Sequence, residues 1–264
     1  MAKNYNFNLS HLPERTVSPR KNGVTMVMDK GISLKHAEDF VENYSDYVDF
    51  VKLGFGTSVM SKNVKEKIKI YQKAGIKTYL GGTLFEAFVA RGKFDDYQKF
   101  IESYGLDTAE VSDGSINMDH DSKCNFISKL SKNFTVLSEV GSKEEGIIIH
   151  PAKWTSMMKA ELEAGSFKVI AEARESGTVG IFHKNGSAHS LLITRITNKI
   201  KVEDIIWETP QKSQQVYFIN LFGANVNVGN ISVDDVIPLE TLRIGLRGDT
   251  FFNYLPEGTK DKVF

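Results

Sequence analysis

The sequence predicts an α/β protein with a single domain, built as a (β/α)8 barrel of the TIM type. Short apolar, β-branched segments recur along the 264 residues, and each is followed by a polar or glycine-containing turn and then by a helical pattern. This alternation indicates right-handed βαβ units around a parallel sheet. About eight such units fit this barrel, whose typical size is about 250 residues.

Eight segments are predicted as strands because they are short, apolar and rich in β-branched residues. In chain order they are residues 24–29, 49–54, 77–83, 108–114, 135–141, 168–172, 205–208 and 224–229. Helical patterns lie between them. Ser33 is placed to cap a helix that runs through Tyr44, and Gly75 is a natural end for the amphipathic helix after the second strand. A helix carrying Glu86 follows the third strand.

The barrel is expected to occupy residues 23–264, including a C-terminal extension. Residues 1–22 are polar and contain Pro13 and Pro19, so they are interpreted as an N-terminal arm that packs across the bottom of the barrel or on a neighbouring subunit. An open, doubly wound sheet is the alternative fold. It is disfavoured because no Gly-x-Gly-x-x-Gly motif follows the first strand.

Composition narrows the class of partner. Lys and Arg number 33 and so do Asp and Glu, and no basic run follows a single face, so nucleic acid is not expected as a partner. There is neither a signal peptide nor an apolar run that could span a bilayer, so we expect no membrane partner. Cys124 is the single cysteine, which suits a reducing compartment. We therefore expect a cytoplasmic protein.

Charged and amide side chains collect where the predicted strands end. They are Asp29 and Lys30; Lys52; Thr83 and Glu86; Glu110, Ser112 and Asp113; Ser138, Glu139 and Lys143; Glu172, Arg174 and Glu175; Glu208; Asn225 and Asn227. In a barrel the carboxyl ends of the strands meet at one mouth. Several carboxylates around one pocket favour Mg²⁺, and the lack of His-x-x-x-His or Cys-x-x-Cys pairs disfavours zinc. A structural ion-pair network is the alternative interpretation.

The last unit, residues 223–232, runs from a strand into the start of a helix. Its glycines let the backbone approach a ligand, and free N–H groups at a helix start favour an anion such as phosphate. A tight turn that needs glycine and asparagine is the alternative. Arg243 and Arg247 lie just beyond, where either guanidinium could reach the same anion or form a surface salt bridge.

Lys52 lies inside an apolar strand, so it is interpreted as an ion-pair partner or as an acid or base. A Schiff-base role, as in lysine-dependent aldolases, is a further option. Neighbouring carboxylates would keep the amine protonated, which favours a cationic anchor or a proton donor.

The strand ends share short motifs with a known family. The motifs are Asp29-Lys-Gly31, Lys52-Leu-Gly-Phe-Gly56-Thr57, Gly81-Gly82-Thr83-Leu-Phe-Glu86, Glu110-Val-Ser-Asp113-Gly114, Ser138-Glu139-Val-Gly141, Glu172-Ala-Arg174-Glu175-Ser-Gly177 and Asn225-Val-Asn227-Val-Gly229-Asn230. In this order and spacing they resemble the phosphosulfolactate synthase family, from about Gly23 to Asp249. Members of that family are (β/α)8 barrels that use Mg²⁺ to add sulfite to phosphoenolpyruvate, giving (2R)-phospho-3-sulfolactate. In methanogens this reaction opens coenzyme M biosynthesis.

The resemblance implies roles for individual residues. The family's proposed acid falls on Lys143, with Lys52 as the alternative acid and Arg174 as a further catalytic residue. The carboxylates on the metal side are Asp29, Glu110, Glu139 and Glu172. Phosphate would be held by Arg174 and the turn of Asn227, Gly229 and Asn230, with Asn225 and Arg247 beside it, while Lys30 or Lys52 would attract sulfite.

The resemblance also implies a homo-oligomer, with a trimer as one option. Two other functions stay open. One is a non-catalytic family member with a binding or heat-stress role, and the other is a related phosphoenolpyruvate-using lyase with another nucleophile. The intact set of charged strand ends favours the synthase, because a pocket freed from catalysis has no reason to keep so many charges together.

Overall fold

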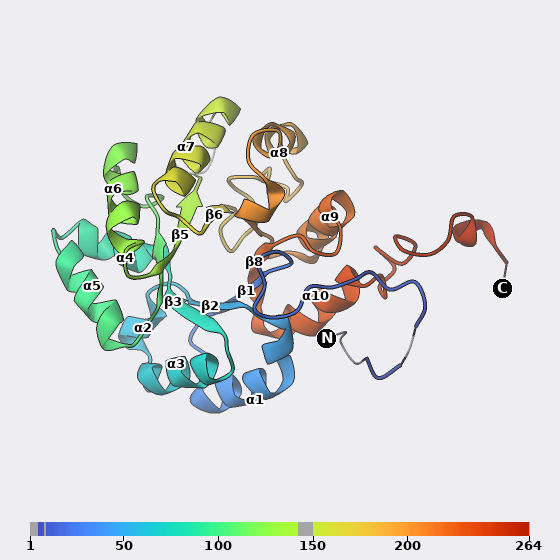
Figure 1. Cartoon of the computed structure of the whole chain (residues 1–264), viewed down its shortest axis with the longest axis horizontal. Helices are drawn as coiled ribbons and strands as arrows, with labels where there is room; N and C mark the ends of the chain where they lie inside the picture. Colours follow the sequence, from blue (N-terminus) through green and yellow to red (C-terminus); the bar gives the residue numbers. More distant parts are fainter. Residues whose placement is uncertain (1–4, 8, 142–149, 264) are drawn as a thin grey trace.

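Eight parallel strands form one sheet that curls into a nearly closed barrel, with helices on its outside (Figure 1). The structure is a computed structural model that describes residues 5–7, 9–141 and 150–263. The strands are hydrogen-bonded in the order β3-β2-β1-β8-β7-β6-β5-β4, and the two end strands, β3 and β4, contact each other. The predicted (β/α)8 barrel is confirmed.

The strands are short, as a barrel requires. They are β1 (Thr25–Asp29), β2 (Phe50–Leu53), β3 (Lys77–Leu80), β4 (Thr108–Val111), β5 (Thr135–Val140), β6 (Lys168–Ala171), β7 (Ile205–Glu208) and β8 (Val228–Ser232). Seven of them fall within the segments that the sequence predicts.

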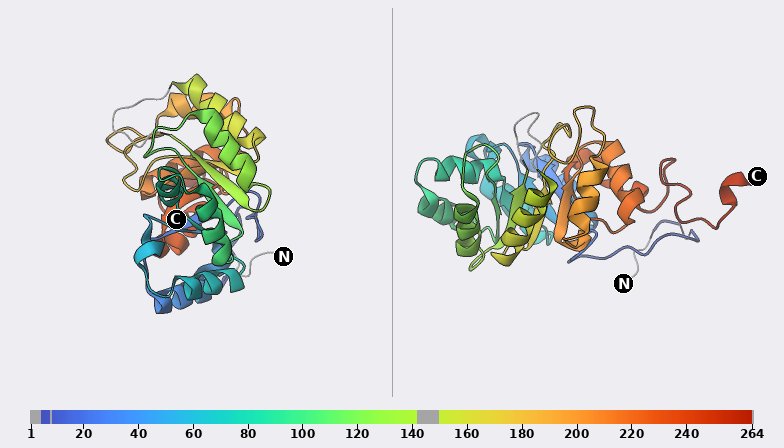
Figure 2. Two further views of the ribbon diagram at one scale, coloured as in Figure 1. Left: turned by 90° about the vertical axis from the view of Figure 1, so that its left-hand side faces the viewer. Right: turned by 90° about the horizontal axis from the view of Figure 1, so that it is seen from above.

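Helices alternate with these strands and surround the sheet in all three views (Figures 1 and 2). Their bounds are α1 (Leu34–Tyr44), α2 (Thr57–Met60), α3 (Val64–Lys73), α4 (Gly82–Val89), α5 (Phe94–Ser103), α6 (His120–Leu130), α7 (Pro151–Glu163), α8 (Ser190–Thr197), α9 (Lys212–Phe222) and α10 (Val236–Arg243). The predicted cap of α1 is present, since Ser33 Oγ accepts a hydrogen bond from the backbone N–H of His36. Gly75, with a φ of +77°, follows α3 as predicted.

The eighth strand begins four residues later than predicted, at Val228 rather than at Ala224. The segment before it is held at the amino end of the barrel by a buried arginine. Arg243 Nη1 donates to the carbonyl oxygens of Ala224 and Val226, at 2.6 and 2.7 Å. These backbone groups bond to a side chain instead of to a neighbouring strand, which a strand pattern in the sequence cannot show.

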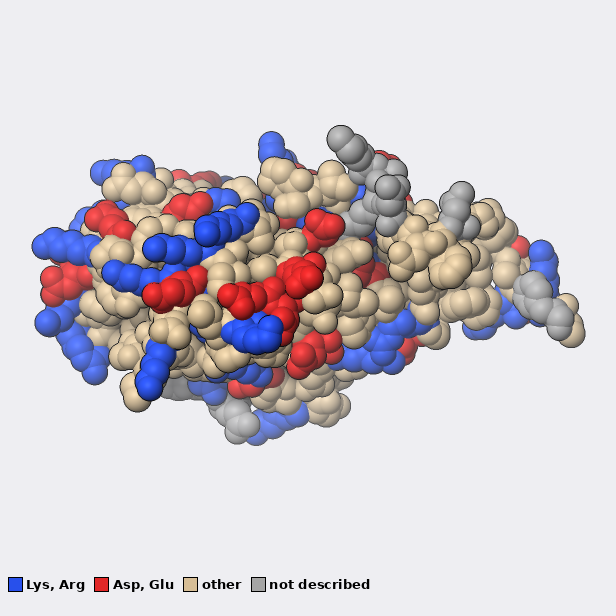
Figure 3. Space-filling model, turned by 90° about the horizontal axis from the view of Figure 1, so that it is seen from below, with Lys and Arg blue, Asp and Glu red and all other residues tan. Residues whose placement is uncertain are grey.

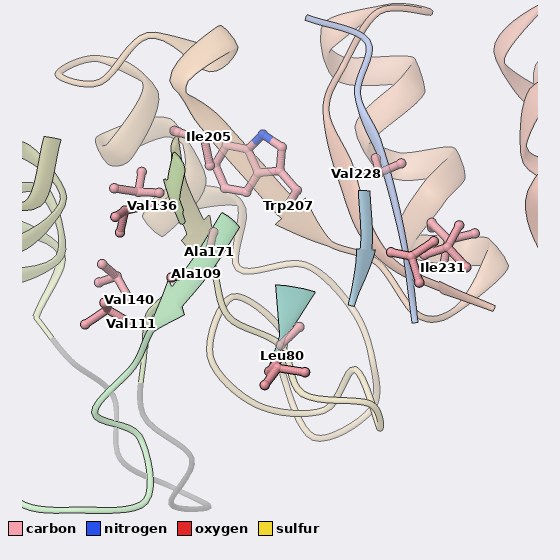
Figure 4. Packing of buried hydrophobic residues seen from close by; sticks show 14 of the residues in the cluster. Leu80, Ala109, Val111, Val136, Val140, Ala171, Ile205, Trp207, Val228 and Ile231 are labelled. Atoms are coloured by element: carbon pink, nitrogen blue, oxygen red, sulfur yellow. The ribbon is translucent and has the colours of Figure 1, made fainter. Parts of the chain in front are cut away.

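The core has two layers because side chains alternate between the two faces of each strand. Outward side chains pack against the helices, and Figure 4 shows ten of them labelled, including Val111 on β4 and Ile231 on β8. Inward side chains form a smaller apolar cluster inside the barrel. Its members are Val24, Met26, Phe50, Tyr79, Leu137, Ile170 and Ile206.

The chain ends lie on one side of the barrel (Figures 1 and 2). The N-terminal segment is tied to the amino ends of the strands by buried charges. Arg15 and Glu240 of α10 form a forked pair with two contacts of 3.0 Å, and Arg20 lies 3.2 Å from Asp49. The boundary at residue 22 between arm and barrel stays a prediction.

The surface mixes both signs of charge. On the face shown in Figure 3, Lys and Arg side chains lie among Asp and Glu side chains rather than in one continuous stripe. None of the helices within the described residues is both long and apolar enough to cross a membrane.

Candidate active site

A cavity of about 470 Å³ opens at the carboxyl ends of the strands. All eight strand–helix units contribute to its lining, which consists of Met28, Lys52, Phe55, Gly81, Gly82, Thr83, Glu110, Ser115, Glu139, Glu172, Arg174, Glu175, Ser176, Glu208 and Asn230. Binding at this end is the rule for this fold.

A layer of charged side chains lies directly above the apolar layer inside the barrel. Its residues follow the inward apolar ones at a spacing of two, because alternate residues of a strand face the same side. The pairs are Phe50 and Lys52, Leu137 and Glu139, Ile170 and Glu172, and Ile206 and Glu208. The strand period therefore carries these charges into the cavity without any special loop.

Lys52 lies at the centre of this layer, surrounded by carboxylates. Its Nζ is 2.9 Å from Oε1 of Glu110, 3.3 Å from Oε2 of Glu139 and 3.7 Å from Oε1 of Glu208. All four residues are buried. Because three carboxylates face one ammonium, a further cation bound in this part of the cavity would be electrostatically favoured.

The protonation of the cluster follows from this geometry. Burial alone would lower the pKa of Lys52, but Glu110, Glu139 and Glu208 together raise it well above its ordinary value. Burial raises the pKa of Glu208 to about 7, and the charge of Glu139 acts in the same direction. Lys52 is therefore a cation at neutral pH, as the sequence suggested, while Glu208 keeps its proton to higher pH than an ordinary carboxyl group does.

Two glycines make room for the carboxylates. A Cβ at Gly82 would lie 2.8 Å from Oε1 of Glu110, and one at Gly141 would lie 2.9 Å from Oε2 of Glu172. The backbone N–H of Gly82 also donates to Glu110 at 2.6 Å. Glycine at these positions thus lets the backbone approach the carboxylates closely.

The donors fit Mg²⁺ bound together with a substrate. Within the described ranges, no three His, Cys, Asp or Glu side chains are grouped to hold an ion by themselves. Mg²⁺ commonly takes one or two carboxylates and completes its coordination with water and substrate oxygens. Glu139 and Glu172, at the ends of neighbouring strands, both face the cavity and offer such a pair.

Asp29 does not belong to this set, which corrects the prediction of a metal-side role. Its side chain points out of the barrel toward α3, as the alternation along β1 requires. Oδ2 accepts from Lys67 Nζ at 2.6 Å and from the Tyr71 hydroxyl at 3.0 Å. Oδ1 accepts the backbone N–H groups of Gly31 and Ile32. The carboxylate is therefore fully used in holding the turn after β1.

The predicted phosphate turn is divided between the two ends of the barrel. Asn225 and Asn227 lie before β8, at its amino end. Asn225 Oδ1 accepts from the backbone N–H of Thr16 at 3.2 Å, and Asn227 Oδ1 accepts from that of Val24 at 3.0 Å. Both predictions of substrate contact are wrong, because the shifted start of β8 leaves these residues below the sheet.

The rest of that turn has different roles. Gly229 lies inside the apolar layer, where a Cβ would come within 2.6 Å of Met26 Cε, so it serves packing and not phosphate. Arg247 is not part of the cavity lining, and Nη1 reaches the carbonyl oxygen of Pro238 in α10 instead. Asn230 does line the cavity, with a φ of +56°, and its buried Oδ1 has no hydrogen-bond partner among the described residues.

The loop after β6 brings Arg174 to the cavity. Arg174 is exposed and adopts a φ of +55°, and Ser176 lines the cavity beside it. Lys30 lies outside the lining and pairs with Glu175, so that this ion pair joins the end of β1 to the loop after β6. Lys143 lies outside the described residues.

The sequence placed Glu208 among the charged strand ends at the mouth of the barrel but gave it no individual role, and it did not single out Ser115 or Phe55; all three line the cavity. The signal for Glu208 was available, since it follows the inward Ile206 by two residues. Ser115 and Phe55 lie on loops, where no periodicity exists to reveal them.

The chain is similar to known proteins over most of its length. A family model described as (2R)-phospho-3-sulfolactate synthase (ComA) matches residues 13–249. The phosphosulfolactate synthase of Methanothermobacter thermautotrophicus is 43% identical over 244 residues, covering 90% of this chain and 95% of that protein. The phosphosulfolactate synthase of Bacillus subtilis is 40% identical over 244 residues, covering 91% and 97%.

Among solved structures, 3-hexulose-6-phosphate synthase from Salmonella typhimurium has a TM-score of 0.52 at 15% identity, covering 85% of this chain and 100% of that one. At this identity the likeness concerns the barrel fold alone. The two sequence relatives and the family model, in contrast, span nearly the whole barrel and its charged strand ends. The chain therefore belongs to the phosphosulfolactate synthase family of enzymes.

Proposed function

We propose that this chain catalyses the Mg²⁺-dependent addition of sulfite to phosphoenolpyruvate, giving (2R)-phospho-3-sulfolactate. The observation that carries the proposal is the cluster of Lys52 with Glu110, Glu139 and Glu208 in the cavity. It combines a buried cation with excess carboxylate, as expected where an anionic substrate meets a metal ion. Relatives named phosphosulfolactate synthase, matched over about nine-tenths of the chain, support the same reaction.

The reaction is an addition that needs one proton. A lone pair of the sulfite sulfur forms a bond to the methylene carbon of phosphoenolpyruvate, and the π electrons move toward the carboxylate. The neighbouring carbon then takes a proton on one face, and the phosphate ester stays intact. When bound by Glu139 and Glu172, Mg²⁺ would supply Lewis-acid stabilisation of the charge on the substrate carboxylate.

We propose Lys52 or Lys143 as the source of that proton. Lys52 is charged and faces the cavity, and proton donation to a carbanion-like centre suits a positioned ammonium. Lys143 is the residue that the family resemblance favours. The two assignments are separated by Lys143→Ala, which should abolish turnover and leave phosphoenolpyruvate binding nearly intact if Lys143 is the acid. Wild-type turnover in this variant would assign the acid to Lys52.

Arg174, Ser176 and Asn230 are proposed to hold the phosphate. A guanidinium forms forked hydrogen bonds with phosphate oxygens, and the hydroxyl of Ser176 and the amide of Asn230 belong to residues that line the same cavity. Lys30 is less suited to attract sulfite than Lys52, because its ammonium is already paired with Glu175 outside the lining.

Phosphorus NMR of the purified protein with phosphoenolpyruvate, sulfite and Mg²⁺ tests the proposal, with each component omitted in turn. A new phosphate-ester signal that requires both sulfite and Mg²⁺ is expected. Unchanged phosphoenolpyruvate in a folded sample would contradict it. Binding of phosphoenolpyruvate without turnover would then support a binding role or another nucleophile.

We also propose a homo-oligomer, on the strength of the family resemblance. Light scattering coupled to size-exclusion chromatography measures its mass directly. A monomer mass of 29.6 kDa would contradict this part of the proposal.

A further inference from the structure

A second buried ammonium, Lys123 of α6, lies behind the charged layer and takes no direct part in the proposed reaction. Its side chain is fully buried between the sheet and α7. Nζ is 2.8 Å from Oε1 of Glu161, 2.9 Å from Oδ1 of Asp113 and 2.6 Å from the main-chain oxygen of Glu139. Glu139 is a cavity residue, so this cluster touches the site through its backbone.

The contact lies on the β4 side of β5, where the ladder has ended, whereas β6 still pairs with Glu139 and Val140. The ladder between β4 and β5 ends with the pair Val111 and Ser138, and Glu139 is the next residue of β5. The ammonium of Lys123 thus holds the carbonyl group just beyond the last ladder pair. The same ammonium binds Asp113, which continues the chain from β4. Lys123 therefore links the chain after β4 to the end of β5, beyond the last pair of their ladder.

Stability alone is a poor account of this cluster. Burial alone would lower the pKa of Lys123, but Glu161 and Asp113 raise it above its ordinary value, so the ammonium is charged. Removing both Lys123 and Glu161 from water costs several kcal/mol per ion, and apolar side chains of similar volume often stabilise a core as well or better. The placement of charge-assisted hydrogen bonds is what an apolar replacement could not supply.

We infer that Lys123 is a positioning residue for the site: it fixes the end of β5 so that the carboxylate of Glu139 stays against Lys52. The consequence for catalysis rests on the proposed function, whereas the consequence for geometry does not. Groups that orient metal-side carboxylates typically change metal affinity or activity by about 10- to 100-fold when removed.

The chain contains a matched control. Lys67 of α3 is 2% exposed and reaches Asp29 at 2.6 Å and the carbonyl oxygen of Ile32 at 3.0 Å. The pair of Lys67 and Asp29 is a buried ion pair like that of Lys123 and Glu161. Neither of its members lines the cavity, and Ile32 does not line it either. Lys67→Met with Asp29→Asn therefore measures the effect of losing a buried ion pair elsewhere in the barrel.

The test compares that control with Lys123→Met combined with Glu161→Gln, which removes both charges together. We expect kcat of the Lys123 double variant to fall about 10- to 100-fold, while the control stays within about threefold of wild type. The concentration of Mg²⁺ needed for half-maximal activity should rise only in the Lys123 variant. An equal fall of kcat in the two double variants, measured well below their unfolding temperatures, would overturn the inference.

Crystal structures of the same variants make the test independent of turnover. The separation of 3.3 Å between Lys52 Nζ and Glu139 Oε2 should widen in the Lys123 variant and persist in the control. If wild type makes no product but this difference is seen, the proposed function fails and the positioning role stands. If the Lys123 double variant does not fold, Lys123→Gln with Glu161→Gln replaces it, and an unchanged kcat there would overturn the inference.

Discussion

The Lys52 ammonium holds together three carboxylates that would otherwise repel one another in a buried site. Like charges that are close and poorly hydrated raise each other's pKa, so the charge of one residue sets the protonation of the others. The behaviour of the site is therefore decided first at the scale of single residues.

Replacing the cation tests this directly. We expect Lys52→Met to lower kcat by about 10²- to 10⁴-fold, because the site loses the charge that holds Glu110 and Glu139 together with one of the two proposed proton donors. Steady-state kinetics measures the change. Lys30→Met removes an exposed ammonium outside the lining and should change kcat little. A Lys52 variant with near-wild-type kcat would contradict the central role given to this residue.

Glu208 predicts a dependence of stability on pH. Burial raises the pKa of Glu208 from 4.5 to about 7, so between these values the folded state binds more protons than the unfolded chain. The free energy of unfolding should then fall as pH rises through this range, by at most about 1.4 kcal/mol per pH unit for this one group.

Urea unfolding at about pH 5 and about pH 8, with a chelator present, checks this sign. Wild type should lose more stability than Glu208→Gln between the two conditions, because glutamine cannot ionise. If the free energy of unfolding changes equally in wild type and in Glu208→Gln between the two pH values, Glu208 does not titrate in this range.

At the scale of elements, the site depends on how closely the loops approach the strands. A Cβ at Gly82 would lie 2.4 Å from Ser112 Oγ and 2.8 Å from Glu110 Oε1. The start of α4 is thus fitted against the side chains of β4 and of the residue after it. Larger residues at this point must displace one of these groups.

We expect Gly82→Ala to destabilise the protein by about 1–3 kcal/mol and to lower kcat through displacement of Glu110. Gly248→Ala is the control, since a Cβ there meets nothing within 4 Å. Thermal unfolding and kinetics together measure both effects. If Gly82→Ala has the same thermal stability and the same kcat as the control variant, the close packing of α4 on β4 has no energetic consequence.

At the scale of the whole molecule, the two ends of the barrel have separate tasks. The carboxyl ends of the strands form the cavity, while the amino ends are held by buried arginines. Arg243 binds backbone carbonyl groups there, and Arg15 fixes the N-terminal segment to α10. A substitution at the amino ends should therefore change the stability of the protein without changing the chemistry of the cavity.

Arg15→Ala tests this separation. The side chains of Arg15 and Glu240 are 2% and 6% exposed, so removal of one leaves the other buried without its main partner. We expect a loss of about 3–5 kcal/mol in the free energy of unfolding, as is typical of broken buried pairs. Below the unfolding temperature kcat should be unchanged. A large loss of kcat in folded protein would show that the two ends are coupled.

The sequence by itself determined the barrel, most of its strands and the composition of the charged layer. The period of the hydrophobic residues, the length of each strand and the residues at its end are local properties, and they can be seen directly in the sequence. The same period-two alternation placed Lys52, Glu139 and Glu172 in the cavity. It also shows that Asp29, on the other face of its strand, points away.

Only the tertiary structure decided which polar strand ends meet. Asn225 and Asn227 look like ligands of an anion in sequence, but the start of β8 depends on Arg243, which lies 18 and 16 residues further along the chain. The partners of Lys52 come from three other strands, and Lys123 reaches Glu139 from a helix. These contacts depend on the register of strands that are distant in sequence, and no local pattern encodes that register.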